Sequence, residues 1–367
     1  MKLRRLTGLL LSLVLLFCTG CSQSAAPRSA PSPTAEEQAL SSPPEASAKA
    51  LSDQQAEETV SNEKTDPAPA QEASFTLCAY LPVSSMTQGA AAVAEEYAGS
   101  IAALDYLVLN TGAYWDENGA LSLSDELLDA IETLQGKTAL WCTVNPQGAL
   151  IREGTAGQSI DTPQERQALA QEIAAFAEQY GLAGIDIDWE FPLDDEWEDF
   201  STFLITLKDT LSRNSEPVAL SLALYPEEIA LSEEAIAALD RIHVMAYDQF
   251  DSEGFHSTMQ AAEDAVAYFT ALGASPQQLV LGIPAYGRPL DGSAQWVFYK
   301  DIDPESISGE NPDLVGDISF NSAATAAQKT QYALEQNLGG VMVYQLLCDR
   351  NDQDALILAC ANMAENA

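Results

Sequence analysis

The stretch LAGIDIDWEFP, residues 182–192, alternates apolar and acidic side chains. Side chains of a β-strand point alternately to its two faces, so Asp186, Asp188 and Glu190 share one face and the isoleucines share the other. The apolar face suits contact with a layer of helices, which leaves the three carboxylates pointing into the centre of the protein. We therefore expect a strand over Gly184–Glu190 that carries a row of acids on its inner face.

Short apolar runs and longer helical patterns alternate on both sides of this stretch. The apolar runs predict strands at Thr76–Leu81, Tyr106–Asn110, Thr138–Val144, Gly184–Glu190, Val218–Leu224, His243–Tyr247, Leu279–Ala285 and Gly340–Gln345. The helical patterns occupy Ser124–Leu134, Pro163–Tyr180, Glu196–Leu211, Met259–Leu272, Ala323–Gln336 and Asp352–Met363. The helix at Pro163–Tyr180 is the clearest, because Thr162 and Glu165 form a capping box before it and Gly181 stands where it should end.

Eight strands that alternate with helices over residues 75–367 predict an α/β fold, a (β/α)₈ TIM barrel, which typically takes about 250 residues. An open doubly wound sheet is the alternative, and the absence of a GxGxxG motif after the first strand weakens it. Active sites of such barrels lie at the C-terminal ends of the strands. Glu190, last in the acidic row, is expected at that end.

The charge of the chain excludes one class of function. The 55 acidic residues outnumber the 16 basic ones, for a formal net charge of −39. A nucleic-acid binder needs Lys and Arg to neutralise phosphates, so no nucleic-acid partner is expected. With only two His, the chain lacks the ligands of a His-rich zinc site, and we expect neither a metal nor a cofactor.

Residues 1–21 read MKLRRLTGLLLSLVLLFCTGC and have the three parts of an export signal: a basic start, an apolar run and small residues. The segment resembles a bacterial lipoprotein signal, in which Cys21 becomes the lipidated N-terminus after cleavage, although Cys18 stands where that pattern usually has Leu. We expect a protein anchored by lipid to the outer side of a cell membrane, with no other membrane contact. The alternative is a plain signal and a secreted protein.

Residues 22–74 contain seven prolines, no aromatic residue and few large aliphatic ones. Such a segment cannot bury enough apolar surface to offset the entropy lost on ordering. We expect a disordered linker between the signal and a folded domain at 75–367.

The acidic row has a chemical consequence of its own. Confined like charges cannot all ionise easily, so at least one carboxyl should hold its proton to a higher pH than in water. Glu190, nearest the mouth of the barrel, is then the candidate general acid. Loop capping, structural ion pairs and a divalent-metal site are the alternatives, although the segment contains no basic partner for an ion pair.

The segment AGIDIDWE resembles the DGxDxDxE signature of family 18 glycoside hydrolases. Three later strands are similar to other motifs of this family, in the same order: HVMAYD at residues 243–248, GIPAYG at 282–287 and GGVMVY at 339–344. The resemblance extends over Phe75–Ala367 and implies the TIM-barrel fold and a chitinase-like activity.

Three departures from the family pattern stand out. Ala183 occupies the place of the first signature Asp, and strand parity directs it away from the acidic row. Tyr344 replaces a Trp that usually forms the floor under the reacting sugar, and it would cover less of the sugar face. The SxGG motif of the third strand is absent, since residues 140–145 read LWCTVN.

The resemblance implies a retaining mechanism in which the 2-acetamido group of the substrate replaces an enzyme nucleophile. Glu190 would act as acid and then base, Asp188 would stabilise the acetamido group, and Asp186 would hold Asp188. Tyr247 would donate to the acetamido oxygen and Asp248 would contact the sugar. The substrate implied is a glycan containing N-acetylglucosamine: chitin or its oligomers, peptidoglycan, or the core of an N-glycan.

Further sugar contacts are expected from Met245 and Tyr344 and from aromatic rings, for each of which ordinary packing is the alternative. The candidate rings are Tyr80, Trp115, Trp141, Tyr286 and Trp296. Only about fifty residues separate Arg288 from the eighth strand, too few for a large inserted domain, so we expect a shallow, endo-acting groove. The four Cys beyond the signal could form disulfides or remain buried thiols, and His243 is expected inside the barrel rather than in catalysis.

Removal of the signal leaves 13 basic against 55 acidic residues, or −42. This charge favours a neutral glycan over an anionic polymer. We expect a monomer. Two other functions remain open: a catalytically weak sugar-binding member of the same fold, and a solute-binding lipoprotein of a transporter.

Overall fold

The computed structural model describes residues 74–303, 305–306 and 311–367. The predictions for the signal, for Cys21 and for the linker up to residue 73 lie outside these residues. Within them, no helix is both long and apolar enough to cross a membrane.

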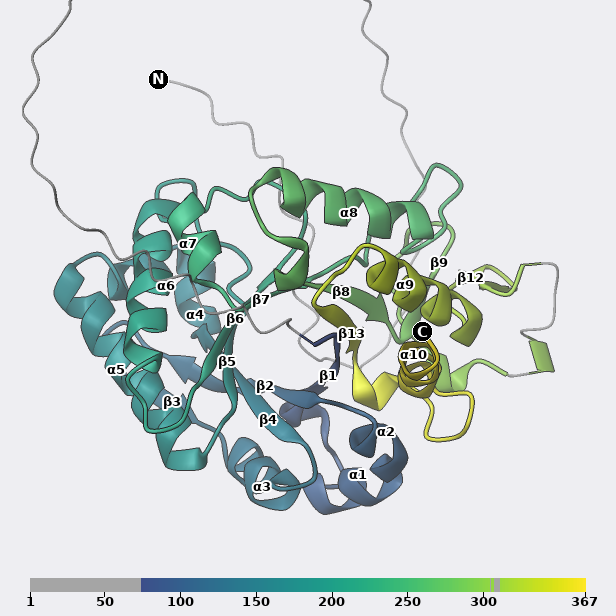
Figure 1. Cartoon of the computed structure of the whole chain (residues 1–367), viewed down its shortest axis with the longest axis horizontal. Helices are drawn as coiled ribbons and strands as arrows, with labels where there is room; N and C mark the ends of the chain where they lie inside the picture. Colours follow the sequence, from purple (N-terminus) through teal and green to yellow (C-terminus); the bar gives the residue numbers. More distant parts are fainter. Residues whose placement is uncertain (1–73, 304, 307–310) are drawn as a thin grey trace, which may run out of the picture. The chain divides into compact units, whose positions relative to one another are not determined.

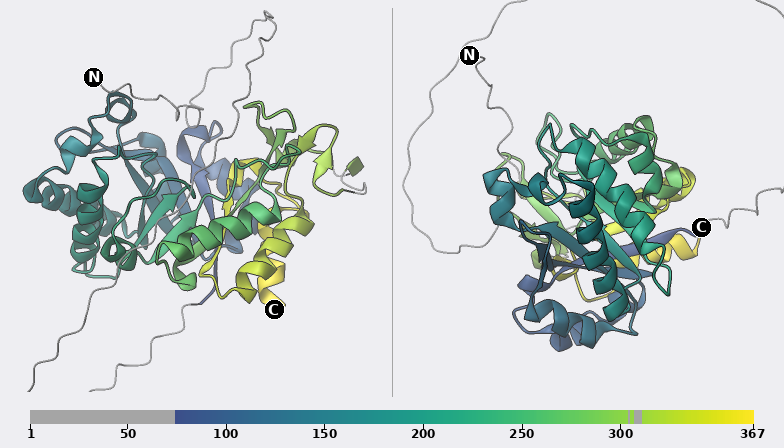
Figure 2. Two further views of the ribbon diagram at one scale, coloured as in Figure 1. Left: turned by 90° about the horizontal axis from the view of Figure 1, so that it is seen from above. Right: turned by 90° about the vertical axis from the view of Figure 1, so that its left-hand side faces the viewer.

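Eight parallel strands close into a barrel, and helices surround it (Figures 1 and 2). The barrel strands are β1 (Thr76–Pro82), β2 (Tyr106–Trp115), β4 (Ala139–Pro146), β5 (Gly184–Ile187), β6 (Ala219–Leu224), β7 (Arg241–Val244), β8 (Leu279–Pro284) and β13 (Gly340–Tyr344). Each strand pairs with the next in this order, and β1 closes the ring by pairing with both β2 and β13. The predicted TIM barrel and all eight of its predicted strands are confirmed.

The described helices follow the predicted alternation. They are α1 (Ala90–Glu96), α2 (Ala98–Ala102), α3 (Asp125–Leu134), α4 (Gly148–Glu153), α5 (Pro163–Tyr180), α6 (Trp197–Leu211), α7 (Glu233–Ala238), α8 (Met259–Ala271), α9 (Ala323–Glu335) and α10 (Leu356–Glu365). The sequence did not predict α1, α2, α4 and α7, all of which are short. The last helix begins four residues later than predicted, because the carboxylate of Asp349 accepts the backbone N–H groups of Leu356 and Ile357 and so caps the first turn there.

Two of the predicted strands end three residues early. The strand predicted at Gly184–Glu190 ends at Ile187, and the strand predicted at His243–Tyr247 ends at Val244. Beyond Ile187 the amide of Asp188 donates to the side-chain Oδ1 of Asn145 at 2.9 Å, and this bond replaces a ladder hydrogen bond to β4. Asp188 and Glu190 therefore lie on the loop that leaves the barrel strand.

Buried side chains form two layers, one between strands and helices and one inside the barrel. The inner layer is mostly aromatic and comprises Cys78, Tyr80, Tyr106, Val108, Trp141, Met245, Tyr247, Val280, Tyr286 and Met342. Gly184 faces this layer, since a Cβ atom there would lie 2.1 Å from the ring of Trp141. Ala183 precedes β5, so strand parity does not apply to it, and it packs against the inner layer.

A small antiparallel sheet follows β8 and was not predicted from the sequence. Its strands are β10 (Val297–Phe298), β9 (Tyr286–Pro289), β12 (Ile318–Ser319) and β11 (Leu314–Val315), in that spatial order. A further short strand, β3 (Leu121–Leu123), pairs antiparallel with the end of β2. The four strands of two to four residues in the small sheet give little periodic signal, which is why the sequence pattern did not reveal them.

The capping box at the start of α5 is present as predicted. Thr162 Oγ1 accepts from the amide of Glu165 at 3.2 Å, and Glu165 Oε2 accepts from the amide of Thr162 at 2.8 Å. Replacing Thr162 by Ala removes the side-chain acceptor, and we expect it to lower the free energy of unfolding by about 1 kcal/mol. Urea denaturation would measure this loss.

Thr202→Ala is the matched control, because Thr202 is exposed within α6 and caps nothing. Alanine favours a helix interior over threonine, so this variant should keep or slightly raise the stability. An equal loss in both variants would contradict a specific role for the cap.

Candidate active site

Asp186 lies at the centre of the barrel interior and is fully buried. Its Oδ2 accepts from the hydroxyls of Tyr80 at 2.8 Å and Thr143 at 3.2 Å. Its Oδ1 lies 2.5 Å from the hydroxyl of Ser221, which donates to it, and 3.1 Å from Nδ1 of His243. These groups come from β1, β4, β6 and β7, so four strands hold this one carboxyl group in place.

The register of the barrel explains two of these contacts. Thr143 on β4 and Ser221 on β6 are the direct neighbours of Asp186 in the parallel ladders on either side of β5. Thr143 belongs to the LWCTVN segment that lacks the SxGG motif, and it nevertheless supplies a hydroxyl to the acidic row.

Asp188 and Glu190 follow Asp186 toward the mouth, and the Glu190 carboxyl group lies close enough to that of Asp188 to influence its protonation. Burial raises the pKa of Asp188 well above its usual value, and the charges of Glu190 and Asp186 raise it further. A raised pKa was expected for at least one acid of the row, and Asp188 is such a group. A protonated Asp188 beside Glu190 gives the pair a proton that can move between them.

Tyr247 lies against the same carboxyl groups. It is buried, and burial raises its pKa well above 10, with the charges of Tyr344, Asp188 and Glu190 adding to the effect. The phenol therefore remains protonated, and able to donate a hydrogen bond, at neutral pH. Met245, the other predicted residue of this segment, is buried in the inner layer two residues before it.

Asp248 is held by three residues of the protein. Its Oδ2 accepts from the hydroxyl of Tyr286 at 2.8 Å, its Oδ1 pairs with Arg288, and Nε2 of His256 lies 3.4 Å from Oδ1. Burial opposes ionisation, but His256, Tyr286 and Arg288 outweigh it and lower the pKa of Asp248. Its backbone has a φ of 62°, the left-handed region, in which the amide donates to Nε2 of His256 at 3.0 Å.

Sequence reasoning missed Arg288 and His256 as partners of Asp248. Arg288 follows the GIPAYG motif directly, so its position beside a motif that ends a barrel strand was the available signal. No comparable signal pointed to His256, which reaches Asp248 through the turn between β7 and α8.

Tyr344 ends β13 and is half-buried among other rings. Its ring centroid lies 5.4 Å from that of Tyr247, in a stacked arrangement, and 5.7 Å from that of Tyr80. Trp296 approaches it edge-on at 6.3 Å. Tyr344 and Trp296 are the two predicted sugar-contacting rings that keep part of their surface exposed.

The other candidate rings are buried, which favours the packing alternative for them over contact with sugar. Tyr80 is 2% exposed and its hydroxyl is bound to Asp186. Tyr286 is 1% exposed, and Trp296 stacks on it with ring centroids 3.8 Å apart. Trp115 and Trp141 lie within the outer and inner layers. These rings pack inside the protein around the residues of the site.

The four Cys of the described chain, Cys78, Cys142, Cys348 and Cys360, are free and buried. Burial raises the pKa of each thiol, to about 12 for Cys348 and Cys360, so none is a ready nucleophile. Among residues 74–303, 305–306 and 311–367, no three His, Cys, Asp or Glu side chains gather in a way that could hold a metal ion.

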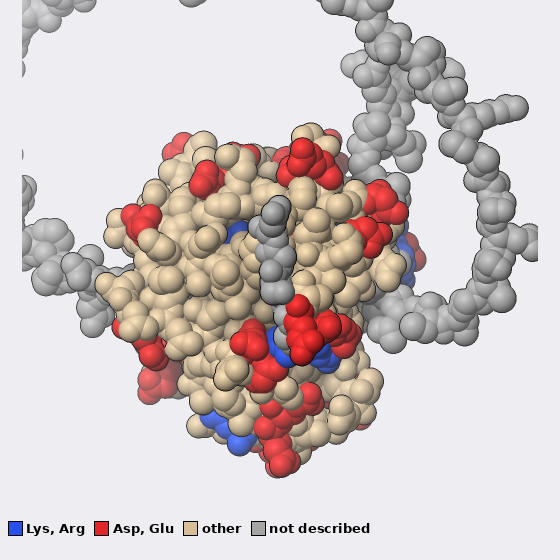
Figure 3. Space-filling model, turned by 90° about the vertical axis from the view of Figure 1, so that its right-hand side faces the viewer, with Lys and Arg blue, Asp and Glu red and all other residues tan. Residues whose placement is uncertain are grey.

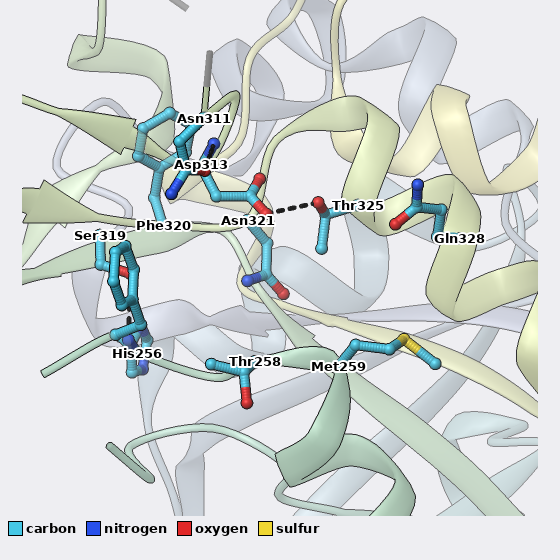
Figure 4. A pocket seen from close by; sticks show the side chains of 11 residues that line it. His256, Thr258, Met259, Asn311, Asp313, Ser319, Phe320, Asn321, Thr325 and Gln328 are labelled. Atoms are coloured by element: carbon cyan, nitrogen blue, oxygen red, sulfur yellow. Dashed lines mark hydrogen bonds between the residues drawn. The ribbon is translucent and has the colours of Figure 1, made fainter. Parts of the chain in front are cut away.

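A hollow of about 230 Å³ lies behind the Asp248 contacts, between the turn before α8 and the start of α9 (Figure 4). Its lining includes His256 and Asp313 but none of the four predicted catalytic residues. Asp313 points to Thr325 and accepts from its hydroxyl at 2.6 Å and from the amide of Ser322 at 2.8 Å. Its carboxylate thus caps α9, which gives this hollow a structural rather than a catalytic lining.

Comparison with known proteins points to one family. The family described as "Glycosyl hydrolases family 18" matches residues 154–349. "Probable chitinase 2" of Drosophila melanogaster is 27% identical over 166 residues, which are 40% of this chain and 34% of that protein. "Chitinase 1" of Aphanocladium album is 24% identical over 245 residues, which are 52% of this chain and 58% of that protein. The matches thus cover between a third and about 60% of these relatives.

The fold is also that of solved chitinase structures. The crystal structure of a chitinase from Bacteroides thetaiotaomicron superposes with a TM-score of 0.66 at 21% identity, over 79% of this chain and 96% of that one. The family match includes the carboxylate segment, the tyrosine and aspartate after β7, and the end of the eighth barrel strand. Because this match extends over more than half of the chain, the protein belongs to the glycosyl hydrolases family 18.

Proposed function

We propose that the protein is a retaining glycoside hydrolase that cleaves β-1,4 linkages beside N-acetylglucosamine by substrate-assisted catalysis. The observation that carries this proposal is the row Asp186, Asp188 and Glu190 at the end of β5, in which desolvation and the neighbouring carboxyl groups raise the pKa of Asp188 well above its usual value. Such a row provides a proton donor and a stabilising carboxyl group side by side at the mouth of a barrel.

Each group then has one role. Glu190 gives its proton to the oxygen of the leaving sugar while the carbonyl oxygen of the substrate's acetamido group attacks the anomeric carbon. Asp188 accepts from the acetamido N–H and stabilises the positive charge of the cyclic intermediate, and Tyr247 donates to the acetamido oxygen. Glu190 next removes a proton from water, which opens the intermediate with net retention at the anomeric carbon.

The substrate class follows from this chemistry and from the charge of the protein. The sugar at the cleavage point must carry an N-acetyl group, which chitin oligomers, peptidoglycan and the N-glycan core all provide. Acidic side chains are spread over the face shown in Figure 3, with few basic ones between them, and the whole chain has a net charge of −39. A neutral chitin-type glycan is therefore favoured over an anionic wall polymer.

We further propose that the barrel works outside the cytoplasm, tethered to the membrane through lipidated Cys21 and the linker. The export pattern of residues 1–21 supports this location. Cleavage of a polymer too large to enter the cell is consistent with an outward-facing enzyme.

A catalytically weak sugar-binding protein is the second candidate. Tyr344 stands where the family usually has Trp, and its ring is enclosed by Tyr247, Tyr80 and Trp296, which leaves less of its surface for stacking on a sugar. This function would keep glycan binding while losing turnover.

Product analysis would test both candidates. The protein would be incubated with chitooligosaccharides, with a high-mannose glycoprotein and with purified peptidoglycan, and fully deacetylated chitooligosaccharides would serve as the matched control. We expect cleavage of N-acetylated chitooligosaccharides, with the β-anomer appearing first by NMR, and none of the deacetylated oligomers. Binding without cleavage would favour the second candidate, and cleavage of both oligomer series alike would contradict a role for the acetamido group.

A further inference from the structure

His243 lies directly beneath the acidic row and is fully buried, yet the proposed reaction gives it no role. Three polar atoms surround its ring. The hydroxyl of Tyr106 lies 2.9 Å from Nε2, the hydroxyl of Tyr80 lies 2.7 Å from Nδ1, and Asp186 Oδ1 lies 3.1 Å from Nδ1. Both ring nitrogens are therefore engaged.

A neutral imidazole has one donor and one acceptor nitrogen, so these contacts allow two arrangements. In the first, Tyr106 donates to Nε2 and the proton lies on Nδ1, which faces Asp186 Oδ1 and the oxygen of Tyr80. The hydroxyl of Tyr80 is then free to donate to Asp186 Oδ2, at 2.8 Å. Together with Thr143 and Ser221, four donors point at the two oxygens of Asp186.

In the second arrangement the proton lies on Nε2 and Tyr80 donates to Nδ1. Tyr80 has a single hydroxyl hydrogen, so Asp186 then loses the donor at Oδ2, and its Oδ1 faces the lone pair of Nδ1. Two acceptors at 3.1 Å repel unless Asp186 itself carries a proton. The position of the histidine proton and the charge of Asp186 are thus linked.

We propose that His243 is a positioning residue: its Nδ1–H, fixed by the hydroxyl of Tyr106 at Nε2, keeps Asp186 as an acceptor-only carboxylate beneath Asp188. This inference rests on the proposed function, because it assigns His243 to the same acidic row. The negative charge of Asp186 is one of the causes that raise the pKa of Asp188. The proton shared by Asp188 and Glu190 therefore depends on a histidine that touches neither of them.

Few other ionisable groups face this ring. Tyr80 comes from β1, Tyr106 from β2 and Asp186 from β5, while Arg241 lies two residues earlier on β7. Cys78 of β1 lies beside the Tyr106 side chain. Burial raises the pKa of Cys78, Tyr80 and Tyr106 far above neutrality, so they remain uncharged. Trp141 on β4 stacks on Tyr106 at 4.3 Å and fixes the ring that carries the hydroxyl.

Tyr106→Phe and His243→Phe test the inference by kinetics on chitooligosaccharides. Each removes part of the donor arrangement while an aromatic ring remains in place. In His243→Phe, loss of the hydrogen bond to the charged Asp186 should lower kcat by about 10- to 100-fold, with KM nearly unchanged. Tyr106→Phe loses a hydrogen bond to a neutral imidazole, so its kcat should fall in the same direction by a smaller factor. The charge of Asp186 is one cause of the raised pKa of Asp188, so a weaker charge there should let Asp188 lose its proton at lower pH. The alkaline limb of the kcat profile should then move to lower pH.

Tyr97→Phe is the matched control, because it also removes a buried tyrosine hydroxyl, one that donates to the backbone oxygen of Asp349 at 3.3 Å. It should leave the pH profile in place. An unchanged kcat and pH profile in folded Tyr106→Phe, or the same changes in Tyr97→Phe, would overturn the inference.

NMR of the ring nitrogens gives a readout that does not depend on activity. The chain contains two His, so ¹⁵N-histidine labelling yields two imidazoles, and the His243→Phe variant or, if it does not fold, a His256→Gln variant assigns them. We expect His243 in the wild-type protein to carry its proton on Nδ1 with Nε2 unprotonated. A proton on Nε2, alone or together with Nδ1, would overturn the inference. Absence of cleavage by the wild-type protein would refute the proposed function. The NMR measurement of the His243 proton would still be informative, because it does not depend on activity.

Discussion

Replacing Glu190 by Gln is expected to lower kcat on chitooligosaccharides by about 10²- to 10⁴-fold, the usual contribution of a positioned general acid. Glutamine keeps the size of the side chain and can still hydrogen-bond to Asp188, but it cannot give a proton to the leaving oxygen. The binding surface around it stays intact, so the affinity for the same oligomers should remain within a few fold. Initial rates and titration calorimetry on one protein preparation would separate the two effects.

Glu198→Gln is the matched control for this variant. Glu198 is exposed in the first turn of α6, a few residues beyond Glu190, and the same change of charge there should leave kcat as it is. Undiminished cleavage by Glu190→Gln would contradict the assignment of the general acid. Equal losses in both variants would show that net charge rather than proton transfer was responsible.

Much of this site could be predicted from the sequence because it depends on local periodicity. A period of two places Asp186 on the inner face of β5, and the apolar residues between the acids identify the outer face. The same logic found all eight barrel strands. It predicted β5 to be three residues longer than it is. The strand ends where the amide of Asp188 donates to the side chain of Asn145 on β4 instead of to a backbone carbonyl.

The residues that hydrogen-bond to Asp186 and Asp248 could not be predicted from local periodicity. Thr143 and Ser221 contact Asp186 because the register aligns them with it across two strand pairs, and a single sequence does not reveal register. Arg288 reaches Asp248 across forty residues of chain. The four buried rings show the same limit, because an aromatic residue near the end of a strand can face a sugar or fill the barrel, and the surrounding side chains decide which.

Asp188→Asn is expected to lower kcat by about 10²- to 10³-fold, as for the loss of one group that stabilises charge in a transition state. Asparagine fits the same space, but it cannot become a carboxylate opposite the positive charge of the intermediate. Its amide also cannot hold the proton that Asp188 and Glu190 share. Steady-state kinetics on N-acetylated chitooligosaccharides should show a lower kcat for this variant.

The pH dependence of the same variant has a definite sign. Burial and the charges of Glu190 and Asp186 raise the pKa of Asp188, so the wild-type pair retains its proton to a higher pH than a free carboxyl group would. Without the second titrating carboxyl, the pair should lose its proton at lower pH, and the alkaline limb of kcat should shift downward. Asp195→Asn, an exposed acid on the same loop, should leave the limb in place.

Asp188→Asn should have a lower kcat than the wild type but a higher free energy of unfolding. A carboxyl with a raised folded pKa contributes stability at low pH that is lost as the pH rises through that pKa, because the folded state then holds an unfavourable buried charge. Asp188→Asn removes that charge, so its unfolding free energy should exceed that of the wild type most clearly at alkaline pH. An inactive variant that is more stable than the wild type would show that the fold accepts a cost at Asp188 for the sake of chemistry. An inactive variant that is less stable at every pH would instead indicate a structural role for the carboxyl group.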